Sequence, residues 1–181
     1  FKEKNLIVSP KILINQNSKG FSACLNYGIQ RTNSNFIIRL DTDDRLDKHR
    51  LSLQINQMYK NELDICSSYM KDKKGKILKY PKNLSQILFM TSLGCNPIAH
   101  PSVCVRRNIL IEAYNEQLVY CEDFELWIRL FFSKSLRFRC LNQPLTKYNI
   151  LRSREKDKIN AYCQLRIRLK FLKKLIILFF P

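Results

Sequence analysis

The sequence of 181 residues is short of acidic residues, glycine and histidine. It has 15 Asp and Glu against 32 Lys and Arg, a formal net charge of +17, and only four Gly and two His. So few glycines count against the glycine-rich phosphate loop expected of a metal-dependent nucleotidyltransferase. No Cys-x-x-Cys pair, internal repeat or low-complexity segment is visible. A structural zinc site and a repeat architecture are therefore disfavoured.

The basic excess does not by itself indicate a nucleic-acid-binding protein. Lys and Arg are spread along the chain, and no recognised nucleic-acid-binding module or basic stripe with interleaved aromatic residues is present. The seven cysteines are scattered, and the start of the chain does not have the form of a signal peptide. We therefore expect reduced thiols in a cytoplasmic protein.

Length and a 45% hydrophobic content fit one domain with a sizeable core. We assign residues 1–151 to this domain and residues 152–181 to a basic amphipathic C-terminal helix. Arg166, Lys170, Lys173 and Lys174 fall on one face of that helix, and Leu165, Leu169, Leu172 and Ile176 on another. Such a helix either lies on an anionic membrane surface or packs back on the domain, and the pattern leaves both open. The apolar run 175–180 is too short to span a bilayer.

Apolar periodicity predicts helices that alternate with strands. Helices are expected at residues 21–32, around 51–59, at 85–93 and at 122–132. Strands are expected at 36–40, 102–106, 136–141 and 145–150, with a hairpin formed by 63–70 and 77–80. This alternation predicts a three-layer α/β fold with a partly mixed sheet. Ligands of such sheets bind beyond the carboxyl ends of the strands.

The most informative stretch is Asp41-Thr42-Asp43-Asp44, which directly follows the predicted strand 36–40. Clustered carboxylates repel one another unless a hard cation lies between them. Mg²⁺ or Mn²⁺ is commonly held by one or two carboxylates together with water and substrate phosphates. The alternative is a turn that opens the next helix, with Asp47 as its N-cap. The cluster alone does not decide between these two interpretations.

Three other segments accompany this cluster in a fixed order. They are residues 15–29, which contain Asn26-Tyr27-Gly28; Asn96-Pro97-Ile98-Ala99-His100-Pro101-Ser102; and Glu122-Asp123-Phe124-Glu125-Leu126-Trp127-Ile128-Arg129. The ordered set resembles the inverting nucleotide-sugar glycosyltransferases of the GT-A fold (glycosyltransferase family 2), particularly bacterial enzymes that build lipopolysaccharide and other surface glycans. Members usually begin with a strand-helix-strand unit that holds the nucleoside, and nothing before Asn15 has that form. We therefore expect a GT-A-like mixed sheet without this unit, in an amino-terminally truncated member.

The resemblance implies inverting transfer of a hexose from a nucleotide-diphosphate sugar to a glycan or lipid-linked acceptor. It implies Mn²⁺ or Mg²⁺ at Asp43, with Asp41 and Asp44 nearby, and Asp123 as the general base beside Glu122. At the start of a helix, Asp123 is expected to stay ionised with a pKa well below 7. The same resemblance assigns donor binding to Asn17, Lys19, Gly20, Asn26, Arg39 and Asp41, and acceptor or diphosphate contacts to His100 and Trp127.

Other interpretations stay open for each of these features. Glu122 and Asp123 also fit an ordinary acidic first helical turn, Trp127 a core residue, and His100 a hydrogen-bonded loop histidine. At the level of function, the alternatives are a non-catalytic fragment with a binding or scaffold role and, less favoured, a metal-dependent nucleotidyltransferase. Peripheral contact with the inner face of the cytoplasmic membrane is a further expectation from the C-terminal helix.

Overall fold

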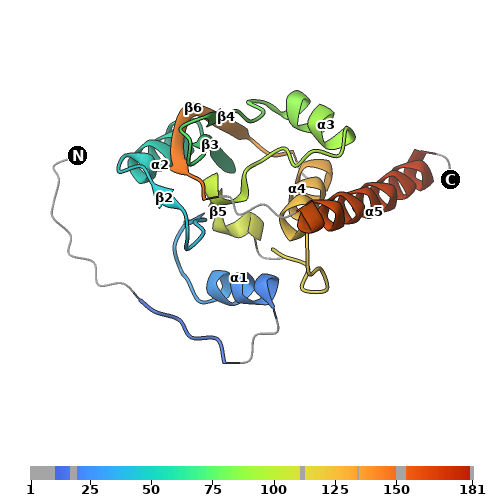
Figure 1. Cartoon of the computed structure of the whole chain (residues 1–181), viewed down its shortest axis with the longest axis horizontal. Coiled ribbons are helices and arrows are strands. Elements are labelled where there is room, and N and C mark those ends of the chain that lie inside the picture. Colours follow the sequence, from blue (N-terminus) through green and yellow to red (C-terminus); the bar gives the residue numbers. More distant parts are fainter. Residues whose placement is uncertain (1–10, 17–19, 111–112, 134, 150–153, 180–181) are drawn as a thin grey trace.

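The computed structural model of the chain describes residues 11–16, 20–110, 113–133, 135–149 and 154–179, and within the last helix the side chains of residues 158–171 (Figure 1). Five α-helices are present in this part of the chain: α1 Phe21–Gln30, α2 Arg50–Lys60, α3 Leu84–Ser92, α4 Glu122–Ser133 and α5 Arg154–Phe179. Two short 3-10 helices, His100–Ser102 and Arg107–Leu110, flank β5. The strands of the described chain are β1 Phe36–Ile38, β2 Arg45–Leu46, β3 Ile65–Lys71, β4 Ile77–Leu78, β5 Cys104–Arg106 and β6 Phe138–Lys147. The order of helices and strands is the one that periodicity predicts, except that β2 was not predicted and that β6 takes the place of two predicted strands.

The strands form one six-stranded mixed sheet in the order β1-β5-β3-β6-β2, with β4 paired to β3. β3 and β6 are parallel, whereas the other pairs are antiparallel. The predicted hairpin is confirmed, because β3 and β4 pair across a turn at Gly75, whose φ of +88° suits glycine. Within the described residues no strand precedes α1.

Alternate residues of the central strands enter two different cores. Ile65 and Val105 pack with Trp127 and Leu130 of α4, whereas their neighbours Cys66 and Cys104 pack with Met58 of α2. Because successive side chains of a strand point to opposite faces, α2 covers one face of the sheet and α4 the other. The predicted three-layer arrangement is therefore confirmed.

Residues 136–150 differ from the prediction of two separate strands. They contain one continuous strand, β6, which pairs with β3 from Phe138 to Lys147. The register shifts around Tyr69, opposite Pro144. Proline has no N–H to donate to the ladder, and a local bulge is where a sheet tolerates it. The polar residues Asn142 and Gln143 suggested a loop, but they lie within the strand.

A buried arginine joins the sheet to α2. The side chain of Arg50, the first residue of α2, is completely buried. Its five hydrogen bonds run from Nε to Gln54 Oε1 (2.9 Å), from Nη1 to Pro101 O (2.7 Å) and Thr146 Oγ1 (2.8 Å), and from Nη2 to Arg39 O (2.9 Å) and Val103 O (3.2 Å). Burial lowers the pKa of Arg50 to about 10, so the group is charged at neutral pH. Gln54 extends the network by donating to Cys66 O and Ser102 O.

The C-terminal helix α5 packs on α4 through residues other than those assigned above to its apolar face. Cys163, Ile167 and Phe171 lie against a cluster that contains Phe124 and Ile128 of α4. Leu165 and Leu169, assigned above to the apolar face, are both exposed. The helix therefore has two apolar sides, and only one of them is covered by the domain.

Replacing Arg50 by methionine should strongly destabilise the fold. Methionine fills much of the same volume but leaves buried carbonyl oxygens without a donor, at a cost on the order of 3–5 kcal/mol in the free energy of unfolding. Urea denaturation followed by circular dichroism measures this change. The exposed Arg139 provides a matched control, since Arg139→Met should alter stability by less than about 0.5 kcal/mol. Equal effects of the two substitutions would contradict the role assigned to Arg50.

Candidate active site

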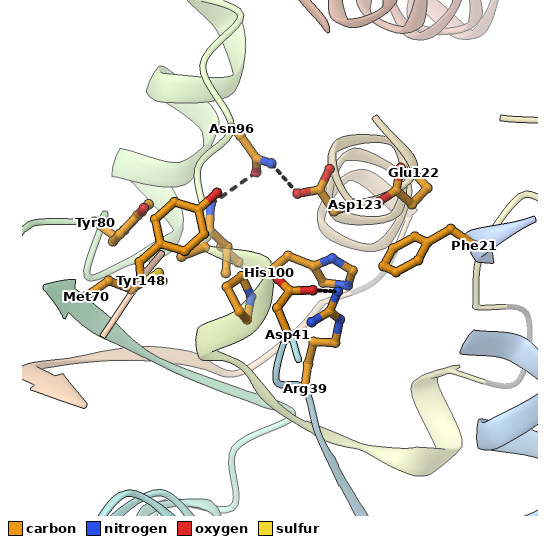
Figure 2. A pocket seen from close by; sticks show the side chains of 13 residues that line it. Phe21, Arg39, Asp41, Met70, Tyr80, Asn96, His100, Glu122, Asp123 and Tyr148 are labelled. Carbon is orange, nitrogen blue, oxygen red and sulfur yellow. Dashed lines mark hydrogen bonds and ion pairs between the residues drawn. The ribbon is translucent and has the colours of Figure 1, made fainter. Parts of the chain in front are cut away.

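A pocket opens where the chain leaves β1, facing the first turn of α4 (Figure 2). Its volume is about 400 Å³. The residues that line it include Phe21, Arg39, Asp41, Asn96, His100, Glu122 and Asp123, with Met70, Tyr80 and Tyr148 on the opposite side. Arg39 and Asp41 follow β1, and Glu122 and Asp123 begin α4, so the fold brings together two acidic segments about eighty positions apart in the sequence.

Asp123 is held by two hydrogen bonds. The amide of Asn96 donates to its Oδ2 at 2.5 Å, and the backbone N–H of Phe124 donates to its Oδ1 at 2.7 Å. Figure 2 shows the Asn96 side chain directed at the Asp123 carboxylate. Asn96 is in turn fixed by the N–H of Ile98, which donates to its Oδ1. The carboxylate therefore has a defined orientation at the edge of the pocket.

The electrostatics of this pair differ from the expectation. Burial raises the pKa of Asp123 above its ordinary value, although the hydrogen bonds from Phe124 and Asn96 lower it. The direction of this shift is opposite to the one expected from the helix N-terminus, because loss of solvent outweighs it. Burial, followed by repulsion from Asp123, raises the pKa of Glu122 to about 7. Both carboxyl groups are thus more basic than in water.

Arg39 and Asp41 form an ion pair on the floor of the pocket. Arg39 Nη2 lies 2.5 Å from Asp41 Oδ1, and the guanidinium carbon lies 5.4 Å from the centre of the Phe21 ring. Within the described part of the chain, Arg39 Nε and Nη1 are buried without hydrogen-bond partners. Two nitrogen atoms of the Arg39 guanidinium thus carry N–H groups that make no hydrogen bond within the described residues. Such groups suit the recognition of an anionic ligand.

The carboxylates of Asp43 and Asp44 lie beside this pocket. Asp43 is exposed and lines a second cavity with Arg45, Lys73 and Lys147; Tyr148 borders both cavities. Asp44 is buried, and its Oδ1 accepts the N–H of Asn149 at 3.0 Å. Burial, with added repulsion from Asp41 and Asp43, raises the pKa of Asp44. Asp44 thus anchors the acidic turn to the segment that follows β6.

The acidic turn has the right donor chemistry for a hard cation. Asp44 Oδ2 is buried without a hydrogen-bond partner among the described residues, and the three carboxylates repel one another. No group of three or more His, Cys, Asp or Glu in the described chain is arranged to hold a metal. A site for Mg²⁺ or Mn²⁺ here would consequently rely on one or two of these carboxylates, completed by water and substrate phosphates, which is the usual mode of Mg²⁺ binding.

Of the two residues expected to contact acceptor or diphosphate, Trp127 belongs to the core and His100 is buried at the edge of the pocket. Trp127 is 1% exposed and packs with Ile65 and Val105, so it offers no stacking surface. The ring of His100 is buried, and its Nε2 shares a hydrogen bond of 2.7 Å with the hydroxyl of Tyr114. Burial lowers the pKa of His100 to about 3. His100 borders the pocket as a neutral group, so it adds no positive charge for a diphosphate.

Of the donor-binding residues expected around the start of α1, one lies next to the pocket, one faces away from it, and two fall outside the described residues. Asn17 and Lys19 lie outside the described residues. Gly20 is the N-cap of α1 with a φ of +112°, directly before the pocket residue Phe21. Asn26 faces away from this pocket: its amide donates to Tyr114 O and Glu116 Oε1 and accepts the N–H of Tyr114. Asn26 therefore joins α1 to the segment before α4 rather than lining the candidate site.

Sequence reasoning missed several residues of the pocket. Asn96 lies in one of the recognised segments, and an amide near paired carboxylates is a signal that could have identified it. Phe21, Met70, Tyr80 and Tyr148 also line the pocket. They come from four separate elements or loops, and nothing in their local sequence distinguishes them from ordinary core or surface positions.

Characterised glycosyltransferases are similar to this chain in sequence. WbnJ, an O-antigen biosynthesis glycosyltransferase of Escherichia coli, is 28% identical over 166 residues, which cover 84% of this chain and 63% of WbnJ. A UDP-Gal:alpha-D-GlcNAc-diphosphoundecaprenol beta-1,3-galactosyltransferase of E. coli is 28% identical over 123 residues, or 63% of this chain and 44% of that protein. The chain thus spans between two fifths and two thirds of the length of these relatives.

Solved structures give the same fold. TarS residues 1–349 of S. aureus, crystallised with UDP-GlcNAc, superpose with a TM-score of 0.60 over 80% of this chain and 43% of that one, at 17% identity. TarS is a GT-A glycosyltransferase, so the predicted fold class is confirmed. The sequence pattern of glycosyl transferase family 2 matches residues 8–124, which contain the acidic turn, the Asn96 segment and the paired carboxylates. On this match, the chain belongs to glycosyl transferase family 2.

Proposed function

We propose that this chain transfers a hexose, with inversion, from a nucleotide-diphosphate sugar to a glycan or lipid-linked acceptor during synthesis of a surface polysaccharide or lipopolysaccharide. The observation that carries the proposal is the pairing of two acidic segments across one pocket: Asp41 and Arg39 after β1, and Asp123 with Glu122 at the start of α4. Family membership favours this function over nucleotidyl transfer.

The chemical step follows from the position of Asp123. An acceptor hydroxyl is a weak nucleophile until its proton is removed. Its oxygen attacks the anomeric carbon, its proton passes to Asp123, and the bond from the anomeric carbon to the diphosphate oxygen breaks. The nucleoside diphosphate leaves with the electron pair. One displacement inverts the anomeric configuration, as in inverting sugar hydrolysis, where a carboxylate activates the attacking oxygen.

Burial makes the two carboxyl groups suited to different roles. Asn96 and the Phe124 amide hydrogen-bond to the Asp123 carboxylate and favour its ionised form, whereas Glu122 has a pKa of about 7 and carries a proton for much of the time. Unequal environments of this kind are how paired carboxyl groups divide acid and base work. We assign the base to Asp123 and a supporting role to Glu122.

The donor diphosphate would lie nearer β1. The two unpaired N–H directions of Arg39 and the positive charges of Arg45, Lys73 and Lys147 near Asp43 can meet its negative charge. Mn²⁺ or Mg²⁺ at Asp43 and Asp41, with Asp44 behind them, would neutralise charge on the leaving diphosphate. Gly20, Asn17 and Lys19 are proposed to contribute from the start of α1.

The acceptor is inferred from relatives. The names of the E. coli proteins specify O-antigen biosynthesis and a diphosphoundecaprenol-linked acceptor. We propose an acceptor of the same class, presented at the inner face of the cytoplasmic membrane. Among the described residues, no helix is both long enough and apolar enough to cross a membrane.

Asp123→Asn should reduce sugar transfer by roughly 10²–10⁴-fold while leaving donor affinity nearly unchanged, because only the proton acceptor is lost. Transfer of labelled sugar from UDP-galactose or UDP-GlcNAc to a GlcNAc-diphosphate lipid measures the rate. Glu122→Gln should have the smaller effect. If Glu122→Gln is the more damaging change, the two roles must be exchanged.

Glu125→Gln provides the matched control for this experiment. Glu125 also lies in the first turn of α4, but its carboxylate pairs with Arg129 on the side away from the pocket. The substitution should therefore leave the transfer rate within about twofold of the wild type, in keeping with the small effect of most changes outside a site. No detectable turnover in the wild type under any of these conditions would favour the scaffold function instead.

Removal of divalent metal should abolish transfer, and Mn²⁺ or Mg²⁺ should restore it. Asp43→Asn should weaken Mn²⁺ binding, measured by calorimetry in the presence of UDP, and should lower transfer with the melting temperature unchanged. Asp72→Asn in the β3–β4 turn is the corresponding control. Undiminished transfer in excess chelator would contradict a metal-dependent step.

Glu122 should also make stability depend on pH. Its folded pKa of about 7 lies above the ordinary value of 4.5, so the folded state binds the proton more tightly than the unfolded state between these values. The free energy of unfolding should consequently fall as pH rises from about 4.5 to 7, by about 1–3 kcal/mol from this group. Urea titrations of Glu122→Gln should show a shallower fall. An identical slope in both proteins would refute the raised pKa.

A further inference from the structure

Helix α5 is covered on one side only. Cys163, Ile167 and Phe171 face the domain and pack with Phe124 and Ile128 of α4. Figure 1 shows α5 beginning beside α4 and extending away from the rest of the domain. Residues on the other side of α5 therefore face solvent along most of the described helix.

The uncovered side carries large apolar residues. Tyr162, Leu165 and Leu169 are 62%, 47% and 50% exposed. At about 100° of rotation per residue, these three lie within roughly 60° of one another and nearly opposite the face that contains Ile167. We call Tyr162, Leu165 and Leu169 the outer stripe. In sequence, Leu172 and Ile176 continue the same spacing.

Positive charge borders the outer stripe on both sides. By the same rotation, Arg166 lies on one side with Lys170 beyond it, and Arg168 lies on the other. No acidic residue follows Asp157 in the sequence. The helix thus combines an apolar stripe with flanking cations, the combination found in helices that lie in the plane of an anionic membrane.

The neighbouring helix α3 adds apolar surface close to the outer stripe. Gly94, just after α3, lies so close to Arg168 that a Cβ at this position would overlap its Nη1. Phe89 and Leu93 of α3 are both exposed. The end of α3 therefore lies against α5 at Arg168, and Leu93, the C-cap of α3, directly precedes this contact in the sequence.

We propose that the outer stripe docks on an anionic lipid surface, with α5 lying parallel to that surface. The apolar side chains enter the interface while the exposed Arg166 and Lys170 contact lipid phosphates. A second copy of the chain is a poorer occupant, because pairing two such stripes would bring these cations against one another. The proposal concerns binding and is independent of whether the chain transfers sugar.

Sedimentation with lipid vesicles tests the proposal. We expect the purified protein to bind vesicles made of equal parts phosphatidylglycerol and phosphatidylcholine, and to bind phosphatidylcholine alone at least ~10-fold more weakly, since each cation near an anionic surface strengthens binding roughly fivefold. The variant Arg166→Glu/Lys170→Glu should lose at least ~10-fold in affinity for the anionic vesicles. The variant Leu165→Ser/Leu169→Ser should lose ~10-fold or more.

Each variant has a control that makes the same change elsewhere on the surface. Lys74→Glu/Lys76→Glu alters the net charge equally in the β3–β4 turn, and Leu51→Ser/Ile77→Ser removes two exposed apolar residues from α2 and β4. Both controls should bind like the wild type, and circular dichroism establishes that all variants are folded. Equal losses in the α5 variants and their controls would overturn the proposal.

Two further results would overturn the proposal. One is equal binding to both kinds of vesicle, since the flanking cations would then have no role. The other is a stable dimer in light scattering that Leu165→Ser/Leu169→Ser dissociates, together with no vesicle binding by the wild type. That second result would assign the outer stripe to a second copy of the chain.

Discussion

Arg50 donates hydrogen bonds to the backbone carbonyls of Arg39, Pro101 and Val103, which belong to two segments far apart in the sequence. One of these carbonyls lies just before the acidic turn, and the other two belong to the segment that runs from the pocket into β5. A single guanidinium with a fixed, planar set of donors therefore joins the chain after β1 to the segment before β5, beside the backbone hydrogen bond from Arg39 N–H to Val103 O. Water cannot replace it, because the group is fully buried. An uncharged side chain would leave the same carbonyls unpaired in the core, which is why the shape of the site depends on this residue.

The candidate site gathers several of the few acidic residues of the chain. Acidic residues are scarce in a chain of net charge +17, yet Asp41, Asp44, Glu122 and Asp123 lie within or beside one pocket. Burial raises the pKa of Asp44, Glu122 and Asp123, so these groups release their protons less readily than in water. A bound cation would favour their ionised forms, whereas its absence leaves them mutually repelled. The stability of the site and the binding of a charged ligand are thus coupled through the same carboxyl groups.

Local sequence predicted the parts of the structure that depend on local physics. Periodicity gave α1, α2 and α4 to within about two residues, and the motif order gave the family, since both are read from neighbouring positions. The network of Arg50 was not predictable, because nothing near residue 50 reveals that its side chain is buried under the sheet. The single strand β6 was missed because its polar residues are accommodated by long-range pairing with β3. The raised pKa of Asp123 depends on desolvation, which is a property of packing and has no sequence signature.

Helix α5 connects the packing of the domain to the orientation of its pocket. Ile167 of α5 packs with Phe124, and Phe124 directly follows the candidate base Asp123. The covered face of α5 and the first turn of α4 therefore share one apolar cluster, so α5 is held at a defined angle to the pocket. If the outer stripe lies on a lipid surface, that cluster determines how the pocket faces it. An acceptor whose sugar is attached to a membrane lipid can reach only a site near the plane of the bilayer, and restricting the orientation of both reactants lowers the entropic cost of bringing them together.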